Sequence, residues 1–203
     1  MLANAPTPRG GTWNREDVIV FAPSSTSELA RVAATGGIPV PVTRLVASQN
    51  SHRWPQFLPD GRRLLFLMAN GQVETRGVYV ASLNGGEPTR VLAAETAAAY
   101  APPGYLLRVS QAVLVAQRFD AANATVAGEL IPVAQGVGED DGVNHSAFSV
   151  SATGVVAHRA GAAARRELVW VDRLGKVWPG RSRAPSPCRL LSPSRWRASG
   201  RGG

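Results

Sequence analysis

The chain has 203 residues, 44% of them hydrophobic, and its 22 Lys and Arg side chains outnumber 14 Asp and Glu, a net charge of +8. This length is sufficient for one domain with a sizeable core, and the single cysteine, Cys188, excludes an internal disulfide and any cysteine-rich zinc site. The sequence contains neither an 18-residue apolar run nor the basic and apolar regions of a secretory signal, so it predicts no membrane span.

One phrase occurs four times along the chain: an aromatic residue, a tight turn and a run of apolar residues. The copies begin, at separations of 44, 43 and 48 residues, with Trp13, Phe57, Tyr100 and Phe148. A period of about 40–45 residues built from short strands is typical of a β-propeller, in which each blade is a four-stranded sheet. The tryptophans interpreted as aromatics that pack between blades are Trp13, Trp54 and Trp170.

The strands of one repeat are clearest in the second copy. Pro59-Asp60-Gly61 is a turn signal before residues 64–68, whose apolar side chains without alternation are typical of a strand buried on both faces. A third strand is expected at residues 78–83, followed by Asn84-Gly85, because both residues accept the positive φ of a type I′ hairpin. Strands in the same place in the other repeats are expected at residues 31–35, 114–120 and 168–175.

Composition and periodicity divide the chain into three parts. Residues 1–10 are an N-terminal extension, residues 11–177 contain the blades, and residues 178–203 form a tail rich in Pro, Ser, Arg and Gly. Residues 1–175 carry 15 basic and 14 acidic side chains, whereas the remainder carries seven basic side chains and no acid. The basic character therefore belongs to the tail, and the blades are not expected to bind nucleic acid.

Three interpretations of the tail remain open. Arg, Pro, Ala and Gly are encoded by G/C-rich codons, so the abrupt change in composition is consistent with a shifted reading frame. The second interpretation is a genuine disordered tail, because this composition cannot bury a core. In the third, the arginines bind nucleic-acid phosphates and Trp196 stacks on a base.

Residues 55–66 read Pro-Gln-Phe-Leu-Pro-Asp-Gly-Arg-Arg-Leu-Leu-Phe, and Gly77-Val78-Tyr79-Val80 and Asn84-Gly85-Gly86 follow them. This segment resembles the TolB-type, WD40-like (PD40) propeller repeat. The wider chain, residues 10–177, is similar to the propeller that follows the kinase domain in bacterial transmembrane serine/threonine kinases, with further matching segments at residues 11–14, 51–57, 100–106 and 167–170. The resemblance implies a sensory or protein-interaction role in signalling, and an extracytoplasmic location if the chain is part of a longer protein.

The predicted fold is an all-β propeller of about four blades, each of four antiparallel strands. TolB-type rings usually have six or more blades, so the resemblance implies an incomplete ring. Open blade edges would expose apolar strands such as residues 64–68, which predicts self-association unless another polypeptide covers them. The expected partners are a protein or a small ligand at a propeller face.

The repeats contain no recognised catalytic motif. Lys176, the only lysine, belongs to neither a P-loop nor a kinase Val-Ala-x-Lys, and His158-Arg159-Ala160 lacks the aspartate of a kinase catalytic loop. No Gly-x-Ser-x-Gly elbow of a hydrolase occurs. The aligned repeat turns contribute residues of turn chemistry rather than a catalytic constellation: Asp17, Asp60, Pro103 and Ala152. We therefore predict no catalytic residue, no cofactor and no metal.

Two weaker site hypotheses concern polar residues in the loops. His52 and His145 fall just before the first strand of their repeats, so they could line a common rim of the propeller and bind a ligand there. Ordinary polar loop histidines are the alternative. Residues 139–144 could offer oxygens to calcium, but they lack the spacing of an EF-hand loop, and a solvated acidic loop is the alternative.

Two functions follow from these features. The first is a non-catalytic propeller that binds or scaffolds, as the sensory or protein-interaction part of a kinase-type signalling protein. On this interpretation the chain is not an enzyme, because kinase or hydrolase activity would need a domain that it lacks. The alternative is a propeller enzyme, or a hydrolase-associated propeller, with an active site in the central channel.

Overall fold

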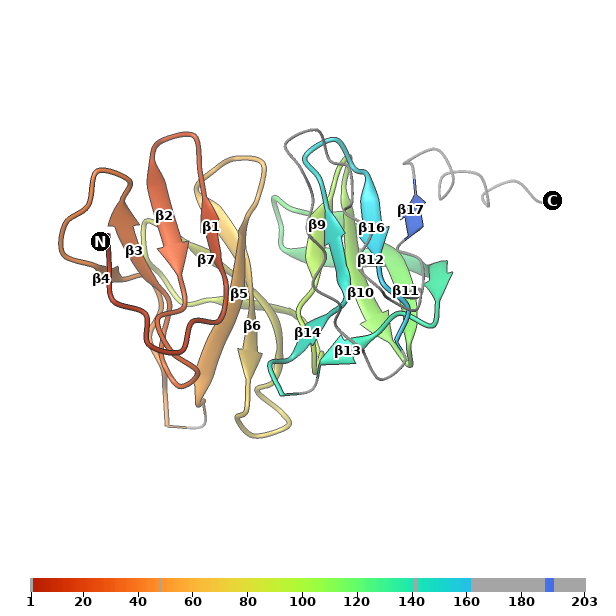
Figure 1. Ribbon diagram of the computed structural model, residues 1–203, viewed down its shortest axis with the longest axis horizontal. Helices are drawn as coiled ribbons and strands as arrows, with labels where there is room; N and C mark the ends of the chain where they lie inside the picture. The colour runs from red at the N-terminus through yellow and green to blue at the C-terminus, as the bar shows by residue number, and fades with distance from the viewer. Residues whose placement is uncertain (1, 48, 141, 162–188, 192–203) are drawn as a thin grey trace, which may run out of the picture.

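We analysed a computed structural model of the chain, which describes residues 2–47, 49–140, 142–161 and 189–191. All the regular secondary structure in these residues is β-strand, and the strands form antiparallel sheets that follow one another along the chain (Figure 1). The predicted incomplete, all-β propeller of four blades is confirmed. Among the described residues there is no helix long and apolar enough to cross a membrane.

Each blade is a meander whose strands pair with their neighbours in sequence. Blade 1 consists of β1 (Gly11–Trp13), β2 (Val18–Phe21), β3 (Ala30–Ala33) and β4 (Val40–Pro41). Blade 2 consists of β5 (Ser51–Phe57), β6 (Arg63–Ala69), β7 (Gly77–Ser82) and β8 (Thr89–Leu92). Blade 3 consists of β9 (Ala99–Ala101), β10 (Tyr105–Ser110), β11 (Val113–Asp120) and β12 (Thr125–Gln135).

The fourth sheet contains the last copy of the repeat. A short pair, β13 (Glu139–Asp140) and β14 (His145–Ser146), precedes it. In the described residues, blade 4 then contains β15 (Phe148–Val150), β16 (Val156–His158) and β17 (Arg189–Leu191). The expected strand at residues 168–175 lies outside the described residues, as does most of the predicted tail. Three tail residues, Arg189–Leu191, form β17 and pair with β16.

The core lies between successive blades. β6 is buried along almost its whole length, as its uninterrupted apolar sequence predicts. Phe66 on one face packs with Val20 and Leu29 of blade 1, whereas Leu65 on the other face packs with Leu106 of blade 3. A third cluster joins blade 3 to blade 4 through residues that include Leu107, Leu114 and Val156. The blades therefore stack in chain order, and successive blades bury the facing sides of their sheets against each other.

Two predicted turns lie where they were expected, but one has a different geometry. Gly61 has φ +66° in the turn between β5 and β6, where the Asp60 carboxylate accepts two backbone N–H groups. Between β7 and β8 the positive φ angles are at Gly85 (+89°) and Gly86 (+96°) rather than at Asn84. The expected type I′ pair Asn84-Gly85 is therefore wrong, because the longer loop places its two left-handed residues one position later.

The tryptophans do not all pack between blades. Trp54 does, since its ring lies against His145, with 4.3 Å between ring centroids, and its indole Nε1 donates to the Val143 carbonyl at 2.8 Å. Trp13 is 60% exposed, so its interpretation as a packing aromatic is wrong. The reason is that Trp13 ends β1 beside the β1–β2 turn, where it lines a surface cleft and its Nε1 donates to the Asp17 carboxylate at 3.2 Å. Trp170 lies outside the described residues.

Gly77 is a position where the close approach of two strands requires glycine. A Cβ on this residue would lie 2.3 Å from the Leu92 carbonyl oxygen of β8, which is backbone and cannot rotate away. We expect Gly77→Ala to lower the free energy of unfolding by about 2 kcal/mol more than Gly37→Ala. Gly37 also has a positive φ, +131°, but no atom lies within 4 Å of its Cβ position, so it reports backbone strain alone. Equal losses of unfolding free energy for the two variants, measured by urea unfolding, would contradict the steric argument.

Candidate functional site

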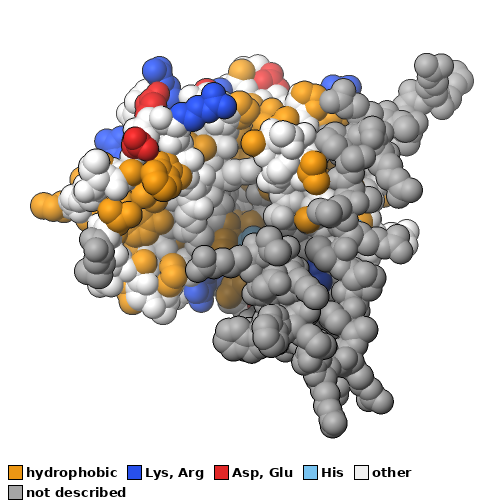
Figure 2. All heavy atoms as spheres, turned by 45° about the horizontal axis from the view of Figure 1, so that its top comes forward, with side chains coloured by type: hydrophobic (Ala, Val, Ile, Leu, Met, Phe, Trp, Pro, Cys, Tyr) orange, Lys and Arg blue, Asp and Glu red, His pale blue; other side chains and the backbone are white. Residues whose placement is uncertain are grey.

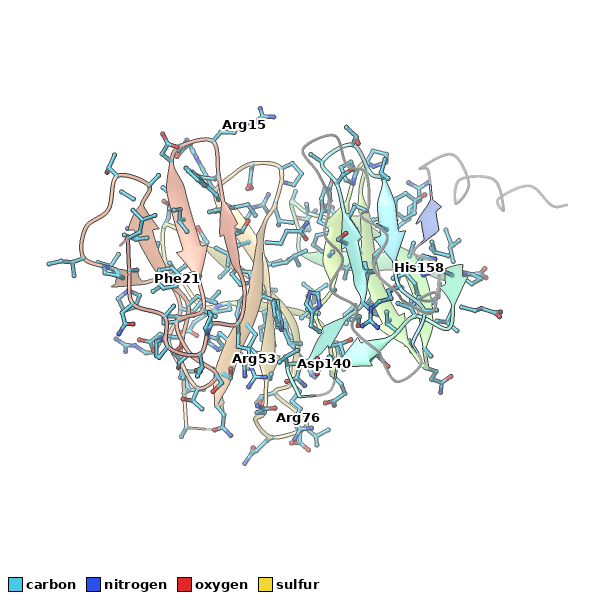
Figure 3. All side chains as sticks on the ribbon, viewed as in Figure 1. Arg15, Phe21, Arg53, Arg76, Asp140 and His158 are labelled. Atoms are coloured by element: carbon cyan, nitrogen blue, oxygen red, sulfur yellow. The ribbon has the colours of Figure 1, made fainter. Side chains whose placement is uncertain are left out.

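A cleft of about 730 Å³ lies at one end of the propeller axis, where the first strands of all four blades reach their turns. We call it the channel cleft. It is lined by residues 12–16, 56–61 and 150–152, together with Tyr100 and Pro102. Arg15 marks this end in Figure 3, and Figure 2 turns the same end forward, with acidic, basic and hydrophobic side chains intermixed on it.

Asn14 holds together the two turns on one side of the channel cleft. Its side-chain Oδ1 accepts the backbone N–H groups of Glu16 at 3.0 Å and Val18 at 2.9 Å, which closes the β1–β2 turn. Its Nδ2 donates to the Gly61 carbonyl at 2.8 Å, in the corresponding turn of blade 2. Asparagine suits this place because its short amide both accepts from and donates to backbone. Asn14 therefore fixes the turn that carries Glu16 against the turn that carries Asp60.

Two further polar side chains join the first strands to one another. The Gln56 amide donates from Nε2 to the Tyr100 carbonyl at 3.3 Å and accepts at Oε1 from the Tyr100 N–H at 2.7 Å. Thr12 Oγ1 accepts the Phe57 N–H at 3.2 Å. A bulge at Trp54, which has φ +55°, shifts the pairing of β5 with β6 between Arg53 and Gln56. The side chains of Thr12 and Gln56 therefore hold the walls of the cleft together, and most of their hydrogen-bonding atoms are used in these contacts.

The two carboxylates that line the channel cleft differ in their availability. Partial burial acts to raise the pKa of Asp60, but hydrogen bonds from the backbone of Arg63 and Arg62 and from the Arg63 guanidinium outweigh it and lower the pKa. The Arg63 Nε lies 2.6 Å from Asp60 Oδ2, so this carboxylate is ionised and occupied. Glu16 is exposed, and its carboxylate has no hydrogen-bond partner among the described residues. Glu16 is therefore the acid that is free to act on a ligand.

The structure places neither predicted rim histidine in the channel cleft. His52 is fully buried in β5, and the Gln49 Oε1 lies 3.2 Å from its Nε2, which must therefore carry the proton. Its Nδ1 then accepts the Thr43 hydroxyl at 2.8 Å, and its ring meets Phe66 edge-on at 4.8 Å. Burial lowers the pKa of His52 to about 4. The neutral imidazole is hydrogen-bonded at both ring nitrogens, packs in the core of blade 2 and is not accessible to a ligand.

His145 lies in β14 and is half-buried. Its ring packs on Trp54, and burial lowers its pKa although the charge of Asp140 opposes the change. Asp140 is the β-ladder partner of His145, which places part of the acidic segment 139–144 in a strand pair rather than in a ligand loop. Within the described residues, no three His, Cys, Asp or Glu side chains come together as a metal site.

No family model matches the sequence, and no curated protein matches it. Solved structures do share the fold. One is a protein classed provisionally as a gluconolactonase, with a TM-score of 0.54 and 16% identity over 76% of this chain and 57% of that one. Another is a gluconolactonase from Xanthomonas campestris, with a TM-score of 0.56 and 14% identity over 92% of this chain and 62% of that one. The chain thus spans less than two thirds of the length of either structure.

These comparisons correct three expectations. Among the solved structures that share the fold, the two described above bear the name gluconolactonase, one of them provisionally, so the resemblance to TolB-type and kinase-linked propellers is wrong. These two proteins bear the name of an enzyme, which overturns the interpretation of the fold as a non-catalytic signalling scaffold and the prediction that the chain is not enzymatic. The strand-turn-strand repeat does not distinguish these classes of propeller, because its residues satisfy hairpin geometry, which propellers of different function have in common.

Sequence reasoning missed the residues of the channel cleft. It placed Asp17 and Asp60 in repeat turns and treated those turns as structural. Glu16, one residue before Asp17, attracted no attention because a single acid in a turn is ordinary. The available signal was positional: equivalent turns of successive blades lie at the same end of a propeller, so every polar side chain in them is a candidate for the axis.

Proposed function

We propose that the chain is part of a propeller enzyme that hydrolyses a sugar lactone bound in the channel cleft. The observation that carries this proposal is the convergence of the first strands of four blades on one cleft. The names of the two matching structures support the substrate class. At about 730 Å³ the cleft lies within the usual range of small-molecule sites and has room for a monosaccharide lactone.

The lining of the channel cleft suits such a ligand. Phe57 and Tyr100 contribute aromatic surface, and the exposed Glu16 contributes carboxylate oxygen atoms that a ligand can reach. Aromatic surface with a few polar groups is the common composition of a site that binds a partly apolar ring and orients it. The hydrogen bonds of Asn14 and Gln56 to neighbouring blades keep the walls in place before a ligand arrives.

Lactone hydrolysis requires water to attack the ester carbonyl. In our proposal the Glu16 carboxylate accepts a proton from that water as the water oxygen bonds to the carbonyl carbon. The tetrahedral intermediate then breaks the ring C–O bond. The ring oxygen takes up the proton that Glu16 holds as it leaves, which restores the Glu16 carboxylate, and the product is an open-chain hydroxy acid. Glu16 suits the part of base because it is the unpartnered carboxylate of the described cleft.

The test is ring opening of glucono-1,5-lactone by the purified chain, measured as base uptake at constant pH above the spontaneous rate. We expect Glu16→Gln to lower kcat by about 100-fold or more, the usual contribution of a general base. Glu87→Gln is the matched control, because Glu87 is exposed in the β7–β8 loop away from the cleft. Wild-type turnover no faster than the buffer, or equal rates for the two variants, would overturn the proposal.

We also propose that a second copy of the chain covers the open side of blade 1. Exposed apolar side chains lie at its β4 edge: Ile38 is 90% exposed and Val40 43%. Such side chains on a blade edge favour association. Sedimentation of the full chain tests this, and a monomer at all concentrations would contradict it. The extracytoplasmic location implied by the kinase resemblance has lost its basis, and we propose none.

A further inference from the structure

Arg53 carries a positive charge into the interior at the end of the propeller opposite the channel cleft. It lies near the start of β5, whose other end reaches the cleft at Phe57, and Figure 3 shows it far from Arg15. Only 2% of its surface is exposed. Its guanidinium donates from Nε to Ser51 Oγ at 2.7 Å, from Nη1 to Asn144 Oδ1 at 2.7 Å and from Nη2 to the Ser25 carbonyl at 2.9 Å.

All three of these acceptors are neutral. Among the described residues no carboxylate forms an ion pair with Arg53, although five N–H donors are available on its guanidinium and three are used. Burial of a charged group without a counter-charge is unfavourable, and proteins usually avoid it by pairing the charge. Within the part of the chain that the structure describes, the charge of Arg53 is therefore solvated by dipoles and has no counter-charge.

A second guanidinium, that of Arg9, worsens this imbalance. The Arg9 carbonyl accepts the Trp54 N–H at 2.7 Å, which places the N-terminal segment beside β5. Burial lowers the pKa of Arg53, and the positive charge of Arg9 lowers it further. The Nη1 of Arg9 reaches only the Thr7 and Pro8 carbonyls, and its buried Nε has no partner among the described residues.

The two guanidinium groups are linked through neighbouring residues: Arg9 Nη1 donates to the Thr7 carbonyl, the Ser25 N–H donates to Thr7 Oγ1, and Arg53 Nη2 donates to the Ser25 carbonyl. An anion bound between the two groups would offset the repulsion of their like charges. The geometry is suited to an oxyanion, because guanidinium groups present paired N–H donors that match the oxygens of a carboxylate or a phosphate. Arg9 is half-buried, so a ligand can approach from its side, while Arg53 supplies its two remaining donors from within.

We propose that Arg9 and Arg53 form a binding site for the oxyanion group of a small molecule, either a carboxylate or a phosphate. Binding offsets the charge of the pair and uses N–H donors that have no acceptor among the described residues. The site does not depend on lactone hydrolysis, since it lies at the other end of β5 from the channel cleft. A sugar-acid carboxylate and a phosphate ester have the same recognition chemistry here, so the experiment separates them.

The experiment is thermal unfolding of the full chain during titration with sodium gluconate or with sodium phosphate, at ionic strength held constant with sodium chloride. We expect a saturable rise in Tm with at least one of the two anions, because a ligand that binds only the folded state stabilises it. The anion that is effective identifies the source of the oxyanion. Retention of the hydrolysis rate measured above, with no Tm response, would reject this site and leave the proposed function standing.

Variants make the assignment specific. Arg53→Met and Arg9→Met should each weaken the response by at least about 10-fold in the midpoint concentration, as loss of a charge-assisted pair predicts. Arg9→Met keeps the inference testable if Arg53→Met does not fold, since the Arg9 side chain donates to the exposed carbonyls of Thr7 and Pro8 rather than to the core. Arg62→Met removes the same charge from an exposed turn and should respond like the wild type. Equal responses in all variants would overturn the site.

Discussion

Replacement of Phe66 with alanine is expected to lower the free energy of unfolding by about 3–5 kcal/mol. Phe66 is 1% exposed in β6 and belongs to the cluster that joins blades 1 and 2. Its ring contacts His52 at 4.8 Å and Tyr79 at 5.7 Å between centroids. Truncation removes the contacts and leaves a cavity between two sheets, whose hydrogen-bonded backbones cannot collapse to fill it. Urea unfolding followed by circular dichroism measures the loss.

Two further variants separate cavity formation from a general sensitivity to mutation. Ile38→Ala removes apolar atoms from a side chain that is 90% exposed, and we expect a change within about 0.5 kcal/mol. Phe66→Leu keeps most of the buried volume and should lose clearly less than Phe66→Ala. If Phe66→Ala costs no more than Ile38→Ala, the packing of blade 1 on blade 2 is not as described.

Acidification from pH 7 to pH 4 is expected to remove up to about 3 kcal/mol of stability through His52 alone. Burial lowers the pKa of His52 from 6.5 to about 4 in the folded chain. Between these values the unfolded chain binds the proton and the folded chain does not, so stability falls as pH falls through this window. The stabilising contribution is complete above pH 6.5. Protonation would also break the bond that Nδ1 accepts from Thr43.

The His52→Gln variant isolates this effect, because glutamine does not titrate. Its unfolding free energy should depend less on pH between 6.5 and 4 than that of the wild type. The pKa of His145 is also lowered by burial, so some pH dependence remains in the variant. The pKa values of Asp60 and Asp120 are lowered as well, but for carboxylates the loss comes at more acidic pH, below about 4. Parallel curves for the two proteins would contradict a neutral, buried His52.

Much of the fold was predictable because its signals are local. The uninterrupted apolar run of β6 can be buried on both faces only between two layers, and the structure places it there. Pro59-Asp60-Gly61 combines a fixed φ, a carboxylate that accepts backbone N–H groups and a residue tolerant of positive φ, so a hairpin follows. The Asn84-Gly85 prediction failed in geometry, since a second glycine, Gly86, allowed the left-handed pair to move along the loop.

By itself, the sequence determined a repeated four-stranded blade, the strand that each blade buries and the places where hairpins turn. Only the tertiary structure decided which polar residues meet. Asn14 bonds to Gly61 across 47 positions, and Arg53 bonds to Asn144 across 91. Spacing in the chain does not encode such pairs, because they depend on how whole blades stack. For the same reason, the stacking of the blades decided the environment of each side chain. Among the described residues, His52 lies in the core, and Glu16 lines the cleft with a free carboxylate. Arg53 is buried without a counter-charge among the described residues.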